Sequence, residues 1–386
     1  MKKIALTLNL GSTSLKASIF DLDKLSSFEA PLDSRTWTRS PSNPMDRASG
    51  SNQVKGPPRQ CSEALSATLD QVAEWISDCW PIPSIVVHRI VHGGTLHGPC
   101  LLNPETLKIL ASFSNWAPSH QARSLALARA ANIRWPSATS IASFDTDWHQ
   151  TLPDLTRTLP ISESLRSDGL RRFGFHGIAY QSVWRQFCGL QADAMERRVV
   201  LAHLGGGSSL CAVKSGSSID TTMGLTPIDG LPMATRSGSI DPGVMVHLLR
   251  KGDISADDLE HEFSEHSGLL GISGSTGDMK QLLSRDDEPA RLAIDIFTHR
   301  TAQGIASMAA TLGGIDDLVF SGGIGSNAPG IRASISQRLE WAGLKIDQQA
   351  NESPNAAVQD TQSTVGIWVL DASEDRELAG SASQWL

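Results

Sequence analysis

The stretch "IALTLNLGSTSLKASIF", residues 4–20, decides the fold, because two apolar runs in it are separated by a short Gly/Ser turn. In each run, apolar residues alternate with polar ones or follow one another for several residues, as in buried strands. The turn is built from residues that tolerate tight backbone geometry. The same design returns far along the chain as "VVLAHLGGGSSLCAV", residues 199–213. A single glycine-rich hairpin is common, but two similar hairpins in one chain indicate a duplicated domain.

Helical patterns follow each hairpin, in residues 62–76, 240–252 and 290–314. The first places leucine, valine and isoleucine at helical spacing, and the second opens with an Asp-Pro pair that is typical of a helix start. The third ends in two glycines and leads directly into the strand-like residues 318–320. Strands that alternate with helices predict an α/β architecture.

The length and composition restrict the class of protein. The chain has 386 residues, which is more than one hydrophobic core usually serves, so two domains are expected. A net charge of −8 argues against a general nucleic-acid or anionic-membrane surface. No apolar run approaches the roughly 20 residues that span a bilayer. The five cysteines are widely spread and form no CxxC pair, which favours a reducing cytoplasm over a disulfide framework.

The segment 26–58 is rich in serine, proline and arginine and weakly patterned. It is interpreted as strands with loose loops, or as partly disordered, and we assign it no function.

Three glycine-rich turns, at residues 11–14, 205–209 and 322–326, each follow a strand-like run. Backbone N–H groups that converge in such turns can hold phosphate oxygens, and Lys16 adds a positive charge close to the first turn. None of the turns matches the P-loop pattern. Each alone is best explained as a tight hairpin without a ligand, whereas the set on a duplicated frame indicates a nucleotide held between two domains.

Cationic side chains occur in three further segments. Arg89 and His92 lie near the end of an apolar run, His176 lies between Phe175 and a glycine, and Arg236 lies in a loop of small residues. An arginine among small residues has no apolar surface to cover, so anion binding is one interpretation. A surface salt bridge is the commoner fate of a single arginine and stays open here.

The stretch "SFDTDWHQ", residues 143–150, spaces Asp145, Asp147 and His149 two apart, so an extended chain would turn all three to one side. A metal cradle, a catalytic carboxylate with two bystanders and a polar strand end all remain possible from this pattern alone.

Ten motifs in sequential order resemble the acetate kinases, with the related propionate kinases, of the acetate and sugar kinase/heat-shock chaperone/actin superfamily. The motifs are "LNLGSTSLK" (8–16), "HRIVHGG" (88–94), "APSH" (117–120), "FDTDWHQTLP" (144–153), "RFGFHG" (172–177), "HLGGGSS" (203–209), "TTMGLTPIDGLPMATRSGSIDPG" (221–243), "SGLLGISGSTGDMK" (267–280), "SGGIGSN" (321–327) and "ASEDRELA" (372–379). The resemblance covers nearly the whole chain, apart from residues 26–60.

The resemblance implies two duplicated ribonuclease-H-like domains of the actin-like ATPase type, with the active site in an interdomain cleft. Residues 1–149 with 373–386 would form the first domain. Residues 150–372 would form the second, which carries nucleotide-binding segments and a homodimer interface. The implied reaction is reversible, direct in-line transfer of the γ-phosphoryl group of ATP to acetate or another short-chain carboxylate, giving ADP and an acyl phosphate, with Mg²⁺ or Mn²⁺. A carboxylate is already ionised at neutral pH, so no general base is needed.

The resemblance also implies roles for individual residues. It assigns Arg89, Asp145, His176 and Arg236 to catalysis, and Asn9 and Glu374 to the metal. It assigns Arg89, Val91, Ser119, His120, Phe175 and Pro227 to the substrate. The nucleotide residues are Ser12, Ser14, Lys16, His203, Leu204, Gly205, Gly206, Gly207, Asp278, Met279, Lys280, Gly323, Ile324, Gly325, Ser326 and Asn327. Asp147 is then a bystander and His149 is structural, so a metal cradle at residues 145–149 is not expected.

Three departures from the family pattern keep alternatives open. Gly206 stands where the family has asparagine, Ser326 where it has glutamate, and Ser119 where it has leucine in the acyl pocket. Ser119 motivates a kinase for propionate or for a longer or hydroxylated acid. Gly206 and Ser326 motivate a weakly active nucleotide-binding regulatory paralogue. A metal hydrolase built on residues 145–149 is a more distant alternative.

Overall fold

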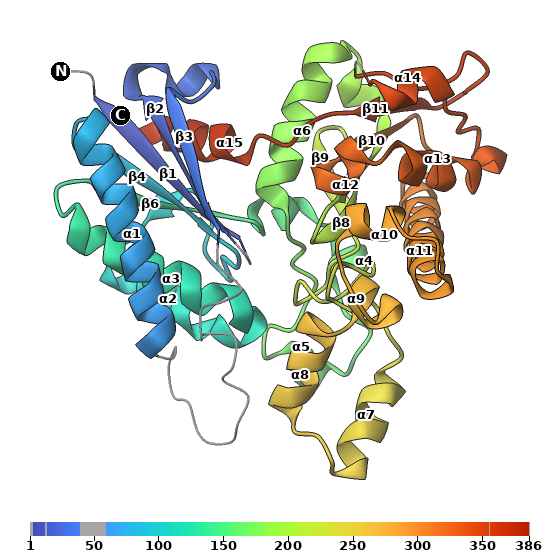
Figure 1. Cartoon of the computed structure of the whole chain (residues 1–386), viewed down its shortest axis with the longest axis horizontal. Coiled ribbons are helices and arrows are strands. Elements are labelled where there is room, and N and C mark those ends of the chain that lie inside the picture. The colour runs from blue at the N-terminus through green and yellow to red at the C-terminus, as the bar shows by residue number, and fades with distance from the viewer. Residues whose placement is uncertain (1–2, 12–13, 39–58, 355, 386) are drawn as a thin grey trace. The chain divides into compact units, whose positions relative to one another are not determined.

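The computed structural model describes residues 3–11, 14–38, 59–354 and 356–385 (Figure 1). The side chains of residues 59–64, 118 and 119 fall outside this description. The chain forms two compact units. Unit 1 comprises Met1–Asp147, Gly177–Ser182 and Ser373–Leu386, and unit 2 comprises Trp148–His176 and Val183–Ala372. Because compactness alone defines these units, the domain bounds expected from the sequence stay a prediction.

The described part of unit 1 contains a six-stranded sheet in the order β3-β2-β1-β4-β6-β5. The strand β2 is antiparallel to both β1 and β3, whereas β4 and β6 run parallel to β1. The strands are β1 (Ile4–Leu10), β2 (Ser14–Asp21), β3 (Asp33–Thr38), β4 (Ile85–Ile90), β5 (Cys100–Leu101) and β6 (Thr139–Phe144). The helices are η1 (Leu22–Ser27), α1 (Arg59–Cys79), α2 (Pro104–Ser112), η3 (Ser114–Trp116), α3 (Pro118–Arg134), α15 (Glu374–Ser381) and η7 (Ala382–Trp385).

The described part of unit 2 contains a five-stranded sheet in the order β11-β10-β7-β8-β9. Its strands are β7 (Arg198–Leu204), β8 (Ser208–Lys214), β9 (Ser217–Thr221), β10 (Asp317–Ser321) and β11 (Gly366–Val369). Its helices are α4 (Asp154–Arg157), α5 (Glu163–Arg166), η5 (Ala194–Glu196), α7 (Pro242–Lys251), α8 (Ala256–Glu265), α9 (Gly268–Ser273), α10 (Met279–Leu283), α11 (Glu288–Leu312), α12 (Gly322–Asn327), α13 (Pro329–Gln337), η6 (Glu340–Ala342) and α14 (Gln348–Glu352). Two further elements, η4 (Asp147–Thr151) and α6 (Gly177–Leu190), have residues in both units.

The two sheets share one topology. Each begins with three antiparallel strands, β1-β2-β3 or β7-β8-β9, and then adds two strands parallel to the first, β4 and β6 or β10 and β11. The hairpins that open the two sheets are the two stretches whose similarity the sequence shows. The prediction of a duplicated α/β fold is therefore confirmed.

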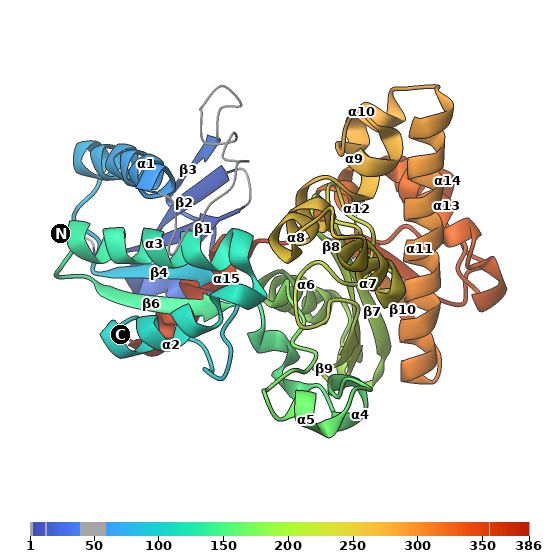
Figure 2. The same ribbon diagram turned by 90° about the horizontal axis from the view of Figure 1, so that it is seen from below.

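Helices cover these sheets through apolar faces. In unit 1, α1 and α3 pack on one face against Leu6, Leu8 and Val86, and α15 packs on the other face against Ala5 and Val87. In unit 2, the long helix α11 lies along one face of the sheet (Figure 2). These cores fix the strand ends from which the candidate site residues project.

The predicted helices are confirmed as α1, α7 and α11, and the strand at 318–320 as part of β10. Asp241 caps α7 by accepting a hydrogen bond from the Gly243 N–H, and α7 ends at Gly252, which has a left-handed backbone. One expectation needs revision: the glycine-rich segment 322–326 forms the short helix α12 and is not a turn. Within the segment 26–58, residues 33–38 form strand β3, in agreement with the interpretation of strands joined by loops, and residues 39–58 lie outside the described structure.

Helix α7 is unusual because none of its residues is buried, although its sequence contains the apolar run Val-Met-Val-His-Leu-Leu. Val244, Val246 and Leu249 are each more than 40% exposed. Figure 1 shows α7 and its neighbour α8 extending beyond the sheet of unit 2. A helix that is apolar around most of its surface normally packs against another surface.

Among the described residues, no helix combines the length and the apolar character that a bilayer crossing requires.

Candidate active site

The guanidinium group of Arg89 is the centre of a polar cluster in unit 1. Arg89 is the next-to-last residue of β4 and points to the α15 face of the sheet. Its Nε atom donates to both Asp145 carboxylate oxygens at 3.1 Å, and its Nη2 atom donates to Asp145 Oδ2 at 2.7 Å. Its Nη1 atom donates to Asn9 Oδ1 at 3.0 Å and lies 3.6 Å from Glu374 Oε2. Arg89 is thus held in one orientation by residues from β1, α15 and the segment after β6.

The carboxylates determine the charge state of this cluster. Burial lowers the pKa of Arg89, but Asp145 and Glu374 more than offset it, so the pKa lies above its ordinary value and the guanidinium stays protonated. Burial raises the pKa of Asp145, with a further contribution from Glu374, against the opposing effect of Arg89. Because the Asp145 carboxylate is occupied by three hydrogen bonds from Arg89, it is poorly placed to accept a substrate proton.

Asn9 and Glu374, the expected metal residues, are adjacent in unit 1. The Asn9 amide donates to Glu374 Oε2 at 2.6 Å. Within the described ranges, no group of three or more His, Cys, Asp or Glu side chains is arranged to hold a metal ion. Mg²⁺ commonly takes only one or two protein oxygens, together with water and substrate phosphates. The carboxylate and amide oxygens of this pair therefore fit a magnesium ion.

Lys16 lies opposite Asn9 in the β1-β2 ladder and forms an ion pair with Asp375, with 3.0 Å between Nζ and Oδ2. The Lys16 side chain is 43% exposed, so the ion pair contributes little to stability. Ser14 begins β2, and its carbonyl accepts a hydrogen bond from the Gly11 N–H. The expected phosphate residue Ser12 lies outside the described residues.

The expected acyl-pocket residues of unit 1 lie in two segments: Val91 follows strand β4, and residues 119 and 120 lie in helix α3. Val91 is buried and His120 is half-buried, whereas the side chain of Ser119 is not described. Gln121 connects the two segments, because its amide accepts from the His92 N–H at 3.0 Å and donates to the His92 carbonyl at 2.8 Å. The sequence did not single out Gln121.

His176 belongs to unit 2 and has a left-handed backbone, with φ 59° and ψ 20°. This conformation is uncommon for a residue that is not glycine. Its Nδ1 atom lies 2.9 Å from Ser209 Oγ, and its ring lies 4.8 Å from the ring of His203. Ser209 was not predicted as a site residue, although it follows the glycine turn in the quoted motif.

Gly207 marks the point at which the imidazole and a guanidinium group of unit 2 converge. A Cβ atom at Gly207 would lie 3.0 Å from His176 Nε2 and 3.6 Å from Arg236 Nη1. Arg236 Nη1 also donates to the Pro227 carbonyl at 3.3 Å and contacts Met233 Sδ at 3.7 Å. The absence of a side chain at Gly207 therefore leaves a guanidinium donor and an imidazole nitrogen next to the same backbone. With a proton on Nε2, this pair has the chemistry that an oxyanion requires.

Phe175 and Pro227, the expected acyl-pocket residues of unit 2, are both buried. Phe175 immediately precedes His176, and Pro227 contacts Arg236 through its carbonyl. Both residues thus lie next to the predicted catalytic groups of the same unit.

The expected nucleotide segments 203–207 and 323–327 are adjacent in unit 2. Ser321 pairs with His203 where β10 lies beside β7, and a Cβ atom at Gly205 would lie 3.6 Å from the Gly323 N atom. The Gly206 carbonyl accepts a hydrogen bond from the Ala234 N–H at 3.1 Å, close to Arg236 in the chain. A Cβ atom at Gly206 would meet nothing within 4 Å, so a side chain fits there.

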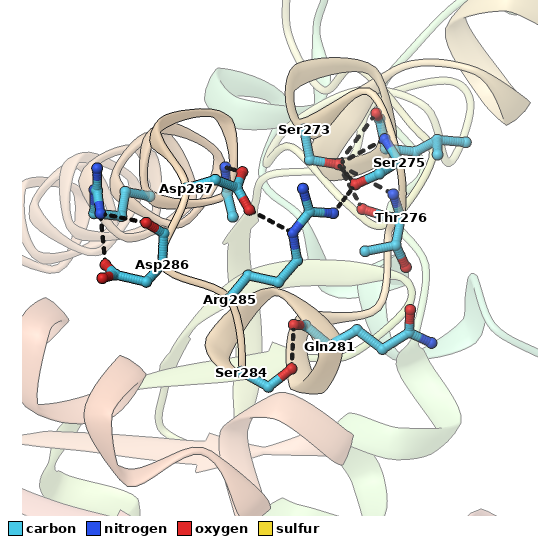
Figure 3. Close-up of polar contacts among 11 residues, drawn as sticks. Ser273, Ser275, Thr276, Gln281, Ser284, Arg285, Asp286 and Asp287 are labelled. Carbon is cyan, nitrogen blue, oxygen red and sulfur yellow. Dashed lines mark hydrogen bonds and ion pairs between the residues drawn. The ribbon is translucent and has the colours of Figure 1, made fainter.

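The third nucleotide segment, Asp278–Lys280, lies at the start of α10. The Asp278 carboxylate caps this helix by accepting from the Lys280 and Gln281 N–H groups. The preceding loop is held by hydrogen bonds of Ser273 Oγ with Ser275 and Thr276 (Figure 3). Arg285 joins this loop to the start of α11, because it contacts Ser275 Oγ and donates to Asp287 Oδ2 at 2.6 Å (Figure 3). Asp278 thus has a structural role in addition to the predicted one.

Arg332 on α13 is a buried arginine that the sequence analysis did not identify. Its Nη1 atom donates to the Gly325 and Ser326 carbonyls at 2.8 and 2.9 Å, and its Nε atom donates to Asn351 Oδ1 at 2.7 Å. Ser326 Oγ in turn donates to Asp371 Oδ1 at 2.6 Å. These bonds fix the end of α12, and no pattern local to Arg332 indicates them.

The side chains of Asp145, Asp147 and His149 do not converge. Asp145 binds Arg89, Asp147 Oδ1 accepts from the Gly98 N–H, and His149 contacts Ser218 and the Phe175 carbonyl. The strand β6 ends before them and η4 begins at Asp147, so the two-residue spacing does not place them on one face. A metal cradle of these residues is absent.

Known proteins resemble this chain along its length. The acetokinase family model matches residues 4–380. An acetate kinase of Rhodopseudomonas palustris is 40% identical over 311 residues, which cover 79% of this chain and 78% of that protein. An acetate kinase of Protochlamydia amoebophila is 35% identical and covers 99% of both chains. The solved structure of a propionate kinase from Francisella tularensis has a TM-score of 0.81 and 29% identity, with 98% of both chains covered.

The arrangement of two duplicated α/β units is thus that of a phosphotransferase with an actin-like ATPase fold. The chain belongs to the acetokinase family.

Proposed function

We propose that the protein is an acetate kinase, which transfers the γ-phosphoryl group of ATP reversibly to acetate and forms acetyl phosphate and ADP. The observation that supports this most is the convergence of His176 Nε2 and Arg236 Nη1 beside Gly207, within a unit that also carries the expected nucleotide segments. We propose that Arg89 of unit 1 acts on the same substrates. Family membership supports the assignment as a whole.

The chemistry follows from the charges involved. The carboxylate substrate has a pKa of about 4 and is ionised at neutral pH, so its oxygen attacks without a base. The obstacle is the approach of an anion to the polyanionic phosphates, which fixed positive charge and hydrogen-bond donors reduce. Arg89 and Arg236 supply planar donors that suit carboxylate and phosphoryl oxygens, and His176 Nε2 donates to a phosphoryl oxygen in the transition state. Asp145 orients Arg89.

Asn9 and Glu374 would hold Mg²⁺, or Mn²⁺, directly or through water. When bound, the ion neutralises phosphate charge. Lys16, Ser12 and Ser14 would contact phosphate, and the segments 203–207, 278–280 and 323–327 would contact the nucleotide. A protein that uses ATP in this way is expected in the cytoplasm.

The preferred acid is tested by comparing kcat/KM for acetate, propionate, butyrate and lactate, with hydroxylamine to trap the acyl phosphate. We expect acetate or propionate to give the largest value, with differences of about 10-fold per methylene. If lactate or butyrate gives the largest value, the enzyme is a kinase for a longer or hydroxylated acid. ATP binding without acyl phosphate from any of the four acids would favour a regulatory paralogue.

We also propose that the protein forms a homodimer through unit 2, and that α7 lies in the interface. The exposed apolar side chains of α7 support this, as does the charge of the two neighbouring helices. Arg250 and Lys251 end α7, whereas α8 carries several carboxylates and no lysine or arginine. Two copies related by a twofold axis could pair α7 of each with α8 of the other.

The oligomeric state tests this proposal. Light scattering should give a dimer for the wild type and a monomer for Val246→Glu, because a carboxylate would be buried in the apolar interface. Ile133→Glu is the matched control, because Ile133 is an exposed apolar residue of unit 1. A Val246→Glu variant that remains dimeric would exclude α7 from the interface.

A further inference from the structure

His149 lies in η4, outside the set of predicted catalytic residues, and is almost completely buried. Its Nε2 atom lies 2.9 Å from the carbonyl oxygen of Phe175, the residue that precedes His176. Its Nδ1 atom lies 2.8 Å from Ser218 Oγ. His149 therefore connects strand β9 to the peptide bond that enters His176.

The chemistry of Phe175 and Ser218 fixes the direction of the two His149 hydrogen bonds described above. A carbonyl oxygen only accepts, so His149 Nε2 carries the proton. Burial lowers the pKa of His149 to about 4, so the ring is neutral and Nδ1 accepts from the Ser218 hydroxyl. Cys211 Sγ donates to Ser218 Oγ at 3.3 Å. A single chain thus runs from Cys211 through Ser218 to His149 Nδ1, and from His149 Nε2 to Phe175.

The backbone around His176 requires such support. A left-handed residue other than glycine is strained by roughly 1 kcal/mol and persists where its surroundings determine it. Upstream of His176, the Phe173 and Gly174 N–H groups both donate to the Gly224 carbonyl. Gly174 has φ 75°, and a Cβ atom there would lie 2.5 Å from the His149 ring. The His149 ring therefore packs directly against the backbone at Gly174 and forms its hydrogen bond with the next residue, at the Phe175 carbonyl.

We propose that His149 is a positioning residue for His176: its hydrogen bond to the Phe175 carbonyl aims the imidazole at the space beside Gly207, and Ser218 and Cys211 hold its tautomer. This inference rests on the proposed function, because it takes His176 as the donor to the transferring phosphoryl group. A displacement of about 1 Å in such a group lowers turnover by up to roughly 100-fold. Substrate binding by other residues should be unaffected.

Two variants of His149 and one control test the kinetic consequence. His149→Leu loses the bond to Phe175, and we expect kcat to fall by about 10- to 100-fold with KM for ATP and acetate within about twofold. His149→Gln keeps an amide N–H that can reach the carbonyl and should recover most of kcat. Thr151→Val is the matched control, because Thr151 Oγ1 bonds the Ser218 carbonyl from the same segment η4 without contacting Phe175.

A kcat of wild-type size in His149→Leu would overturn the proposal. An equal loss in His149→Leu and Thr151→Val, or failure of His149→Gln to recover any activity, would show that the role is structural alone. If His149→Leu does not fold, Ser218→Ala replaces it. That variant removes the donor to His149 Nδ1 while keeping the ring and its bond to Phe175, and a smaller loss of kcat, about threefold to tenfold, is then expected.

An NMR measurement separates this inference from the proposed function. Long-range ¹H–¹⁵N spectra of histidine-labelled protein should show His149 as the neutral Nε2–H tautomer between pH 6 and 8. The ring resonances of His176 should shift in His149→Leu and stay in place in Thr151→Val. A different His149 tautomer, or an unshifted His176 ring, would contradict the inference even for a protein without kinase turnover. The absence of turnover in the wild type, with these spectra as expected, would overturn only the proposed function.

Discussion

The two units have the same strand order but use their arginines differently. In unit 1, Arg89 is enclosed by Asp145, Glu374 and Asn9. The oxygens of Asp145 and Asn9 accept its hydrogen bonds, and the two carboxylates balance its charge. In unit 2, the acceptors that Arg236 contacts include the Pro227 carbonyl and Met233 Sδ, which are neutral groups, and its Nη1 atom faces Gly207. The same frame thus places carboxylates around Arg89, and a backbone carbonyl and a thioether beside Arg236 Nη1. Arg89 therefore contributes to the fold as well as to the predicted site.

The largest expected effects separate these two arginines. Arg236→Ala and Arg89→Ala should each lower kcat by about 10²- to 10³-fold, because each removes a donor to developing negative charge. Arg89→Ala should also lower the free energy of unfolding by about 3 kcal/mol, because Asp145 would stay buried without its partner. Arg236→Ala should lower it by less, because the described acceptors of Arg236 Nη1 are neutral and lose no buried charge partner. Steady-state kinetics measure the loss of kcat in both variants, and urea unfolding measures their loss of stability. Equal losses of stability would show that the two arginines contribute equally to the fold.

Two buried histidines offer a second comparison. His149 in unit 2 has partners for both ring nitrogens, whereas in unit 1 neither ring nitrogen of His88 has a hydrogen-bond partner among the described residues. Burial lowers the pKa of His88 to about 3. The unfolded chain, with a histidine pKa near 6.5, therefore binds more protons than the folded chain below that pH, and stability falls as the pH falls.

We expect His88→Leu to stabilise the protein by about 1 kcal/mol at pH 7.5, because an unsatisfied buried polar group is removed. Between pH 7.5 and 5.0 the wild type should lose about 2 kcal/mol more than the variant, since one histidine no longer titrates. Urea unfolding at the two pH values provides the measurement. An identical pH dependence in the two proteins would mean that the pKa of His88 in the folded chain is close to its value in the unfolded chain.

The smallest expected effect concerns Gly206. Because a side chain fits at this position, Gly206→Asn should restore an amide beside the predicted phosphate segment without loss of stability. We expect KM for ATP to fall about threefold to tenfold, which corresponds to a single hydrogen bond to a charged group. An unchanged or larger KM would show that the asparagine of the family has no role in this unit.

The sequence predicted the elements whose signals are local. The paired hairpins, the capped helix α7 and the long helix α11 follow from apolar periodicity and from capping residues, and the family motifs indicated the fold as a whole. Contacts between distant segments were not predictable in this way. Nothing near Arg332 indicates that its guanidinium group supports the end of α12, and nothing near His149 indicates that its partners are Phe175 and Ser218.

The short helix α12 shows why composition misleads at one point. Residues 322–327 are rich in glycine, which favours turns, but hydrogen bonds from Arg332 and the packing of β10 beside β7 fix this segment as a helix. Tertiary contacts thus override local preference at a predicted nucleotide segment.

The most direct test of the central claim is a ³¹P NMR spectrum of the protein with ATP, Mg²⁺ and acetate. The account predicts a resonance of acetyl phosphate that grows in step with ADP. In Arg236→Ala, this resonance should not appear on the same timescale. Formation of ADP with inorganic phosphate alone, or no reaction of ATP with acetate or propionate, would contradict it.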